Sequence, residues 1–138
     1  MRPARLLLSL LPFGLPALLA GQDTPLPTHP RPPEVTDSAV ARGQALFHGS
    51  ANCVACHGIE GVGTDSGAPL AQGIWLHGPD SYAGIVSRIK HGIPKELSTR
   101  GTTMPMRGWI TLSDAEVLDV AAYVWVISHA WQDRPRRP

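Results

Sequence analysis

The sequence predicts a small all-α domain in which about three main helices are joined by long loops. Three segments show apolar residues at helical spacing behind good capping residues. No strand pattern of useful length occurs in the sequence. The glycine-rich stretches 57–81 and 92–111 remain as loops, and loops of that length are uncommon in a compact domain. Since a domain of this size has a small core, we expect these loops to wrap around one large apolar cofactor.

The first 20 residues have the pattern of a secretory signal peptide, with Arg2 and Arg5 ahead of an apolar run. That run is too short to span a membrane as a helix. An uncleaved anchor is the alternative, but Pro12, Pro16 and the small residues at the end of the run favour cleavage. We expect a periplasmic or otherwise extracytoplasmic protein with no stable membrane insertion after cleavage.

Residues 21–35 are dense in proline and are expected to form an extended linker, because proline lacks an amide donor and fixes φ. The compact domain is expected over residues 36–130. Residues 131–138 are polar, basic and interrupted by proline, which predicts a disordered tail.

The three helices each carry start or stop signals. Thr36 or the residue after it serves as the N-cap of the first helix. Ser81 caps the second, and Gly92 follows its last turn. Ser113 and Glu116 form a capping box at the start of the third. The expected ranges are Asp37–His48, Tyr82–His91 and Asp114–His129.

The residues that carry chemistry are Cys53-Val54-Ala55-Cys56-His57, a C-x-x-C-H sequence typical of c-type haem attachment. Two thiols at this spacing can each add across a vinyl group of one porphyrin edge and form a thioether. The adjacent His57 can then donate a ring nitrogen to the iron as proximal ligand. The sequence therefore predicts one covalently bound haem c.

Other uses of Cys53 and Cys56 fit the chain less well. A structural zinc site needs four ligands, and the sequence has no second cysteine pair. A thioredoxin-like redox pair expects a βαβ context, which is not visible here. A disulfide between them would close too short a loop to constrain the unfolded chain much.

The candidates for a second axial ligand are Met104 and Met106, the two methionines besides the initiator. Isolated methionines usually fill cores, but these lie in a Gly- and Pro-bounded loop before the last helix. A thioether is a soft, neutral ligand that raises the reduction potential. His91 is a weaker candidate, since a surface or capping role is commoner for such a histidine. The other histidines have still less in their favour: His29, His48, His77 and His129.

The arrangement resembles the class I cytochrome c family over about residues 38–128. The positions that carry the resemblance are Gly43 and Phe47 in the first helix, Cys53 to Gly58, Ala68-Pro69-Leu70, Met104-Pro105, and Val120 and Tyr123 in the last helix. The resemblance implies a small cytochrome c fold with its loops wrapped around one covalent haem. Two departures are Ala-Pro in place of the family's Gly-Pro and a longer connection after Met104.

The resemblance also implies roles for single residues. The carbonyl of Pro69 would accept the second ring proton of His57 and orient the imidazole. Met104 would be the distal ligand, with Met106 less favoured. A mid-helix glycine costs stability, so Gly43 is expected to allow a close crossing with the last helix.

Trp75 and Arg88 are further candidates for cofactor binding. An indole N–H or a guanidinium group in a buried site needs an acceptor, and haem propionates would supply it. Simple core packing is the alternative for Trp75.

These features predict an electron carrier and not an enzyme, because two filled axial positions keep substrate from the iron. The alternatives are a haem c subunit of a periplasmic dehydrogenase or oxidase, and a haem sensor or enzyme with an open or labile sixth site. The electron donor and acceptor, the potential and the oligomeric state do not follow from the sequence.

Charge along the chain bears on the partners. Without residues 1–20 the chain has 10 Lys and Arg against 11 Asp and Glu, which excludes the basic footprint of a nucleic-acid binder. Between residues 81 and 110, however, Glu96 is the one acidic residue. The same stretch holds five cations: Arg88, Lys90, Lys95, Arg100 and Arg107. They predict a docking rim for redox partners with an acidic surface, and an ordinary solvated face is the alternative.

Overall fold

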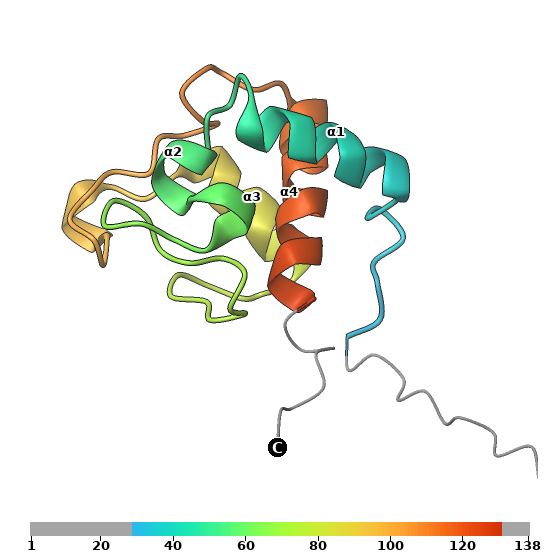
Figure 1. Ribbon diagram of the computed structural model, residues 1–138, viewed down its shortest axis with the longest axis horizontal. Helices are drawn as coiled ribbons and strands as arrows, with labels where there is room; N and C mark the ends of the chain where they lie inside the picture. The colour runs from blue at the N-terminus through green and yellow to red at the C-terminus, as the bar shows by residue number, and fades with distance from the viewer. Residues whose placement is uncertain (1–28, 131–138) are drawn as a thin grey trace, which may run out of the picture.

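The computed structural model describes residues 29–130, in which helices are the main regular elements and long loops connect them (Figure 1). Its helices are α1 (Asp37–His48), α2 (Val54–His57), α3 (Tyr82–His91) and α4 (Asp114–His129), with 3₁₀ turns η1 (Ile59–Gly61) and η2 (Lys95–Leu97). The only extended pairing among these residues is an isolated bridge between Ile93 and Met104. The predicted all-α fold is confirmed. The expected signal peptide, the first part of the linker and the tail lie outside the described residues.

No helix within residues 29–130 is both long enough and apolar enough to cross a membrane.

The three long helices lie where the sequence predicts them. Thr36 accepts a hydrogen bond from the Ala39 amide at the start of α1, and Ser81 does the same for Gly84 in α3. The capping box of α4 is complete, since Ser113 and Glu116 each bond the other's backbone amide. Sequence reasoning did not predict α2, because a single turn of four residues is too short to show periodicity.

Helix α1 crosses α4 at very close range (Figure 1). A Cβ on Gly43 would stand 1.9 Å from the carbonyl oxygen of Asp119 and 3.1 Å from the Cβ of Tyr123. The expected reason for a mid-helix glycine is therefore confirmed. Beside this contact the Arg42 guanidinium donates two 2.8 Å hydrogen bonds to the Asp119 carboxylate.

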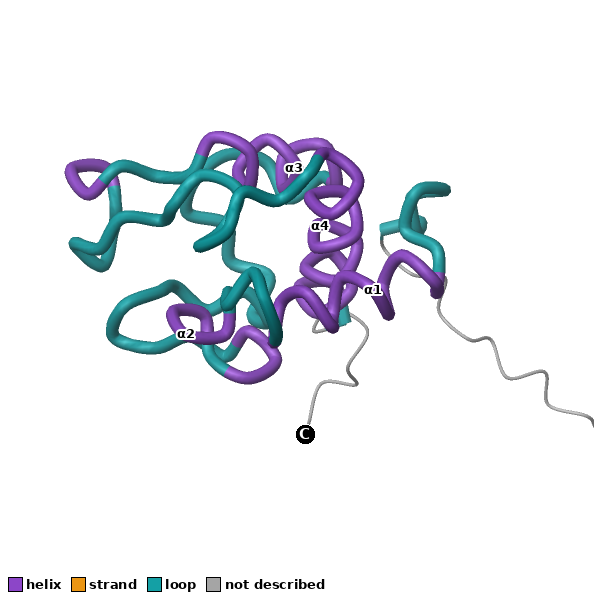
Figure 2. The backbone as a smooth tube through the Cα atoms, turned by 90° about the horizontal axis from the view of Figure 1, so that it is seen from above, coloured by secondary structure: helices purple, strands orange, loops and turns teal. Residues whose placement is uncertain are grey.

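The buried core lies where α1 and α3 pack against α4. Phe47 is fully buried and meets the Tyr123 ring edge to face, with centroids 5.2 Å apart. The other large, fully buried side chains of the described region belong to the same core: Val35, Ile85, Leu112, Val117 and Val120. This core occupies one side of the molecule, and the loops form the other side (Figure 2).

We predict that Gly43→Ala destabilises the folded protein by about 2 kcal/mol or more, because the new methyl group must push α1 away from α4. The thermal unfolding midpoint of the holoprotein should fall by roughly 10 °C. Ala41→Ser, on the exposed side of the same helix, is the control and should change the midpoint little. Equal midpoints for both variants would contradict the close crossing.

Candidate functional site

The loop side of the molecule contains an open cleft made of two adjoining cavities. The cysteine-side cavity, of about 750 Å³ with the solvent at its mouth, is lined by Cys56, Arg100 and Trp109 among others. The helix-side cavity, of about 660 Å³ on the same measure, reaches Val120 and Val124 of α4. Seven residues line both cavities: Cys53, His57, Ala68, His77, Ile89, Ile93 and Met104. The two cavities are therefore parts of one site.

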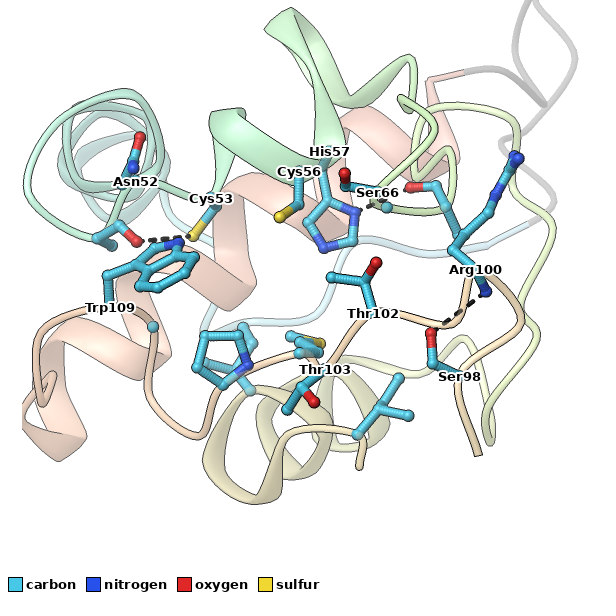
Figure 3. Close-up of a pocket in the computed structure, with 18 of the residues that line it drawn as sticks. Asn52, Cys53, Cys56, His57, Ser66, Ser98, Arg100, Thr102, Thr103 and Trp109 are labelled. Carbon is cyan, nitrogen blue, oxygen red and sulfur yellow. Dashed lines mark hydrogen bonds between the residues drawn. The ribbon is translucent and has the colours of Figure 1, made fainter. Parts of the chain in front are cut away.

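Helix α2 places both cysteines and the histidine on one wall of the cleft. In Figure 3 the Cys53 and Cys56 sulfurs and the His57 ring face the same cavity. Both thiols are free and half-buried. Burial raises the pKa of the Cys53 thiol to about 11, so it keeps its proton at neutral pH. A thioether has no ionisable proton, and burial would not oppose it in this way.

The His57 ring is oriented by one hydrogen bond. Its Nδ1 lies 2.8 Å from the carbonyl oxygen of Ala68. A carbonyl only accepts, so Nδ1 carries the proton and Nε2 is left with a free lone pair. Burial lowers the pKa of the His57 imidazole, although the bond to Ala68 opposes this. The ring is thus held in the neutral tautomer that can bind a metal through Nε2.

The expectation that the Pro69 carbonyl orients His57 is wrong, because the acceptor is the carbonyl of Ala68. Successive carbonyls of an extended chain point to opposite sides, so only one of this pair can face the ring. The residue before a proline is held in extended backbone, which fixes the Ala68 carbonyl. Pro69 itself lines the helix-side cavity.

Across the cavity from Cys53, Cys56 and His57 lies Thr103 (Figure 3). The next residue, Met104, pairs through its backbone with the segment that follows α3. The amide and carbonyl of Met104 bond those of Ile93 at 2.9 and 3.0 Å. Gly92 makes this approach possible, since a Cβ there would stand 2.3 Å from the Met104 carbonyl oxygen. Its φ of 64° is also one that glycine adopts readily. Met104 lines both cavities of the cleft.

The other ligand candidates lie elsewhere. Met106 is 67 % exposed and lines neither cavity. His91 is exposed, and its Nδ1 is engaged by the carbonyl of Ser87 at 2.8 Å. His77, which the sequence did not favour, lines both cavities because the loop before α3 folds back over the cleft. The spacing of His77 from the C-x-x-C-H motif does not predict that His77 lies at the cleft.

Trp75 and Arg88 both line the helix-side cavity. Trp75 is half-buried and packs against the core. The Nε and Nη2 atoms of Arg88 donate to the carbonyl of His77 at 3.1 and 2.8 Å. These bonds hold the 75–78 loop at the cleft. The guanidinium has five N–H groups, so Arg88 has further donors that these two bonds do not use.

The residues of the cleft fit a covalently held haem. The side chains that line the helix-side cavity are mostly apolar, as an aromatic macrocycle requires: Phe47, Leu70, Ile74, Leu76, Ile85, Val120 and Val124. The cleft is also lined by two thiols, an imidazole and a thioether, those of Cys53, Cys56, His57 and Met104. This donor set is that of a c-type haem site.

Comparison with known proteins agrees with this geometry. Residues 40–128 match the model of the family described as cytochrome c. The chain is 34 % identical over 88 residues to a cbb3-type cytochrome c oxidase subunit CcoP of Cereibacter sphaeroides, a match that covers 61 % of this chain and 26 % of that protein. It is 33 % identical over 124 residues to a thiosulfate dehydrogenase of Allochromatium vinosum, covering 85 % of this chain and 41 % of the relative.

The chain thus spans less than half the length of either relative. No solved structure gives a significant match.

Proposed function

Because the chain belongs to the cytochrome c family, we propose that it is a one-electron carrier, with His57 and Met104 as the axial ligands of its haem iron. The cofactor is one covalently bound haem c. We assign its two thioether links to Cys53 and Cys56. The observation that supports the proposal is that the cleft is lined by Cys53, Cys56, His57 and Met104 together.

The bound haem iron supplies a couple that accepts and releases one electron. The protein residues tune and protect it. The bond from Nδ1 of His57 to Ala68 fixes the ring and makes Nε2 a better donor. The apolar lining from α3 and α4 excludes water, which favours the less charged, reduced form. Met104 closes the sixth position, and this is why the proposal is a carrier and not an enzyme.

Arg88 and Trp75 are proposed to meet the haem propionates. Both line the helix-side cavity, and Arg88 keeps donors beyond the two that hold the His77 carbonyl. We further propose an extracytoplasmic location, because the N-terminal sequence has signal-peptide form and thioether-linked haem suits an exported protein that cannot recover a lost cofactor.

A second candidate function is that of a haem c subunit in a redox complex. The observation that favours it is the likeness to an oxidase subunit and to a dehydrogenase, both longer than this chain. The site chemistry would be the same, and only the partner would differ. Purification of the native protein from membranes and soluble fractions, followed by native electrophoresis with haem staining, distinguishes a free carrier from a stable complex.

Fewer of the five cations of the expected docking rim are free to meet a partner than the sequence suggests. Lys90 and Arg107 both pair with Asp114, at 3.3 and 2.7 Å, and Arg88 is turned inward to the His77 carbonyl. Lys95 and Arg100 are exposed and take part in none of the ion pairs within residues 29–130.

One of these two cations, Arg100, lies at the cleft. Arg100 and Trp109 are both exposed and line the mouth of the cysteine-side cavity from opposite sides (Figure 3). We propose that Lys95 and Arg100 steer partners with an acidic surface to this mouth. A few charges around an apolar contact surface suit a short-lived complex. Such charges raise the rate of encounter more than they raise the affinity of the final complex.

The proposed thioether links predict that haem stays with the chain through denaturing electrophoresis and acid-acetone extraction. The combined variant Cys53→Ala with Cys56→Ala should leave little stable holoprotein, because the apolar cleft depends on its cofactor. Ala55→Ser, at the exposed position between them, should retain full haem staining. Cofactor that extracts freely from the wild-type protein would contradict the assignment.

The proposed axial ligand predicts that Met104→Ala abolishes the weak near-red sulfur-to-iron band of the oxidised protein. The potential should fall by roughly 0.1 V or more, because axial ligands set much of its range. Met106→Ala is the matched control and should preserve both. Wild-type protein should also resist added imidazole, whereas the Met104 variant binds it. Ready binding by the wild type would support the sensor alternative instead.

The docking proposal predicts opposite salt effects for oppositely charged electron acceptors. Stopped-flow oxidation of the reduced protein by ferricyanide should slow as ionic strength rises, and oxidation by tris(phenanthroline)cobalt(III) should not. Arg100→Glu, alone and with Lys95→Glu, should slow the ferricyanide reaction several-fold. Arg31→Glu makes the same charge change in the segment before α1, away from the cleft, and is the control. Equal effects of Arg100→Glu and Arg31→Glu would show that only net charge matters.

A further inference from the structure

A second group of metal-binding side chains lies outside the haem cleft. It consists of His29 in the segment before α1, Asp80 in the turn before α3, and His129 at the last position of α4. Each offers one ligand atom, and these atoms lie within 4.8 Å of one another. None of the three lines either cavity of the cleft. Figure 1 shows the start of the described chain and the end of α4 at the same end of the molecule.

His129 is held as metal-binding histidines usually are. It is 6 % exposed, and its ring stacks on Trp125 with centroids 4.2 Å apart. Its Nδ1 lies 2.8 Å from the carbonyl of Trp125 and 3.1 Å from the hydroxyl oxygen of Ser128. The carbonyl can only accept, so Nδ1 carries the proton and Nε2 is free to bind a metal. The same orienting bond is typical of metal-ligating histidines in general.

The other two groups lie close to the His129 ring. The His29 ring meets the His129 ring edge to face, with centroids 5.2 Å apart. His29 is exposed, so its ring can turn at little cost. Asp80 is half-buried and takes part in no side-chain hydrogen bond or ion pair among residues 29–130. A carboxylate in such a place gains most from a cation.

We propose that His29, Asp80 and His129 bind a divalent transition-metal ion of the zinc class. Two imidazoles and one carboxylate form the donor set of many zinc sites, with water completing four-coordination. Metal–ligand distances of about 2.0–2.2 Å place neighbouring ligand atoms about 3.4 Å apart. The observed limit of 4.8 Å requires only a small closure, which the exposed His29 side chain can supply. The ion would tie the segment before α1 to the end of α4.

The test uses the untagged holoprotein, in which the covalent haem already occupies the C-x-x-C-H motif. Titration calorimetry with Zn²⁺ should show one site per chain, and X-ray absorption at the zinc edge should show two imidazole ligands. Saturating Zn²⁺ should raise the thermal unfolding midpoint, because the ion binds only the folded arrangement.

His29→Ala and Asp80→Asn should each weaken Zn²⁺ binding at least about tenfold and remove the thermal shift. Neither change touches the core, so both variants should fold and keep the wild-type haem spectrum. The matched controls are His91→Ala and Asp65→Asn, an exposed histidine and an exposed aspartate outside the group. Both controls should bind Zn²⁺ as the wild type does.

Three results would overturn the proposal. The first is the absence of saturable Zn²⁺ binding at one ion per chain. The second is binding that His29→Ala and Asp80→Asn leave unchanged. The third is equal loss in the controls, which would mean that surface histidines bind the ion non-specifically.

Discussion

The close crossing of α1 and α4 is the contact on which the rest of the structure depends. Gly43 lets the backbone of α1 lie against the Asp119 carbonyl, and Phe47 then reaches the Tyr123 ring one turn later. Together with α3 this crossing makes one rigid side of the domain. The other side consists of loops that backbone hydrogen bonds hold together, such as the two between Ile93 and Met104. A domain built in this way needs its cofactor as part of its core.

Each of the two walls of the cleft is shaped by interactions between residues that are near one another in the sequence. On one wall, four residues of helix bring Cys53, Cys56 and His57 to the same cavity, and the Ala68 carbonyl sets the ring. On the other wall, the bridge between Ile93 and Met104 starts directly after Gly92, the C-cap of α3. Neither wall depends on the other for its backbone geometry. Each proposed ligand is therefore held by contacts within its own segment of the chain.

Local signals in the sequence predicted the long helices and the motif, whereas contacts between distant segments did not follow from it. The three long helices begin at the residues whose side chains can cap them, and capping is a local interaction. The acceptor for His57 is one residue earlier than the family resemblance implied, because the sequence does not show which of two adjacent carbonyls faces the ring. The presence of His77 at the cleft and the pairing of Lys90 and Arg107 with Asp114 depend in the same way on loop packing.

Helix α4 contributes to the cleft, to the crossing with α1 and to the His29, Asp80 and His129 group. Different residues of the helix serve each of these. Val120 and Val124 line the cleft, and Tyr123 faces the crossing with α1. His129 stands at the last turn, past the final residue of α4 that lines a cavity. Because His29 and Asp80 contact neither cavity, an ion bound there would act on the cleft only through the stability of α4. Such an effect would appear in unfolding and would leave the axial ligands, and hence the haem spectrum, unchanged.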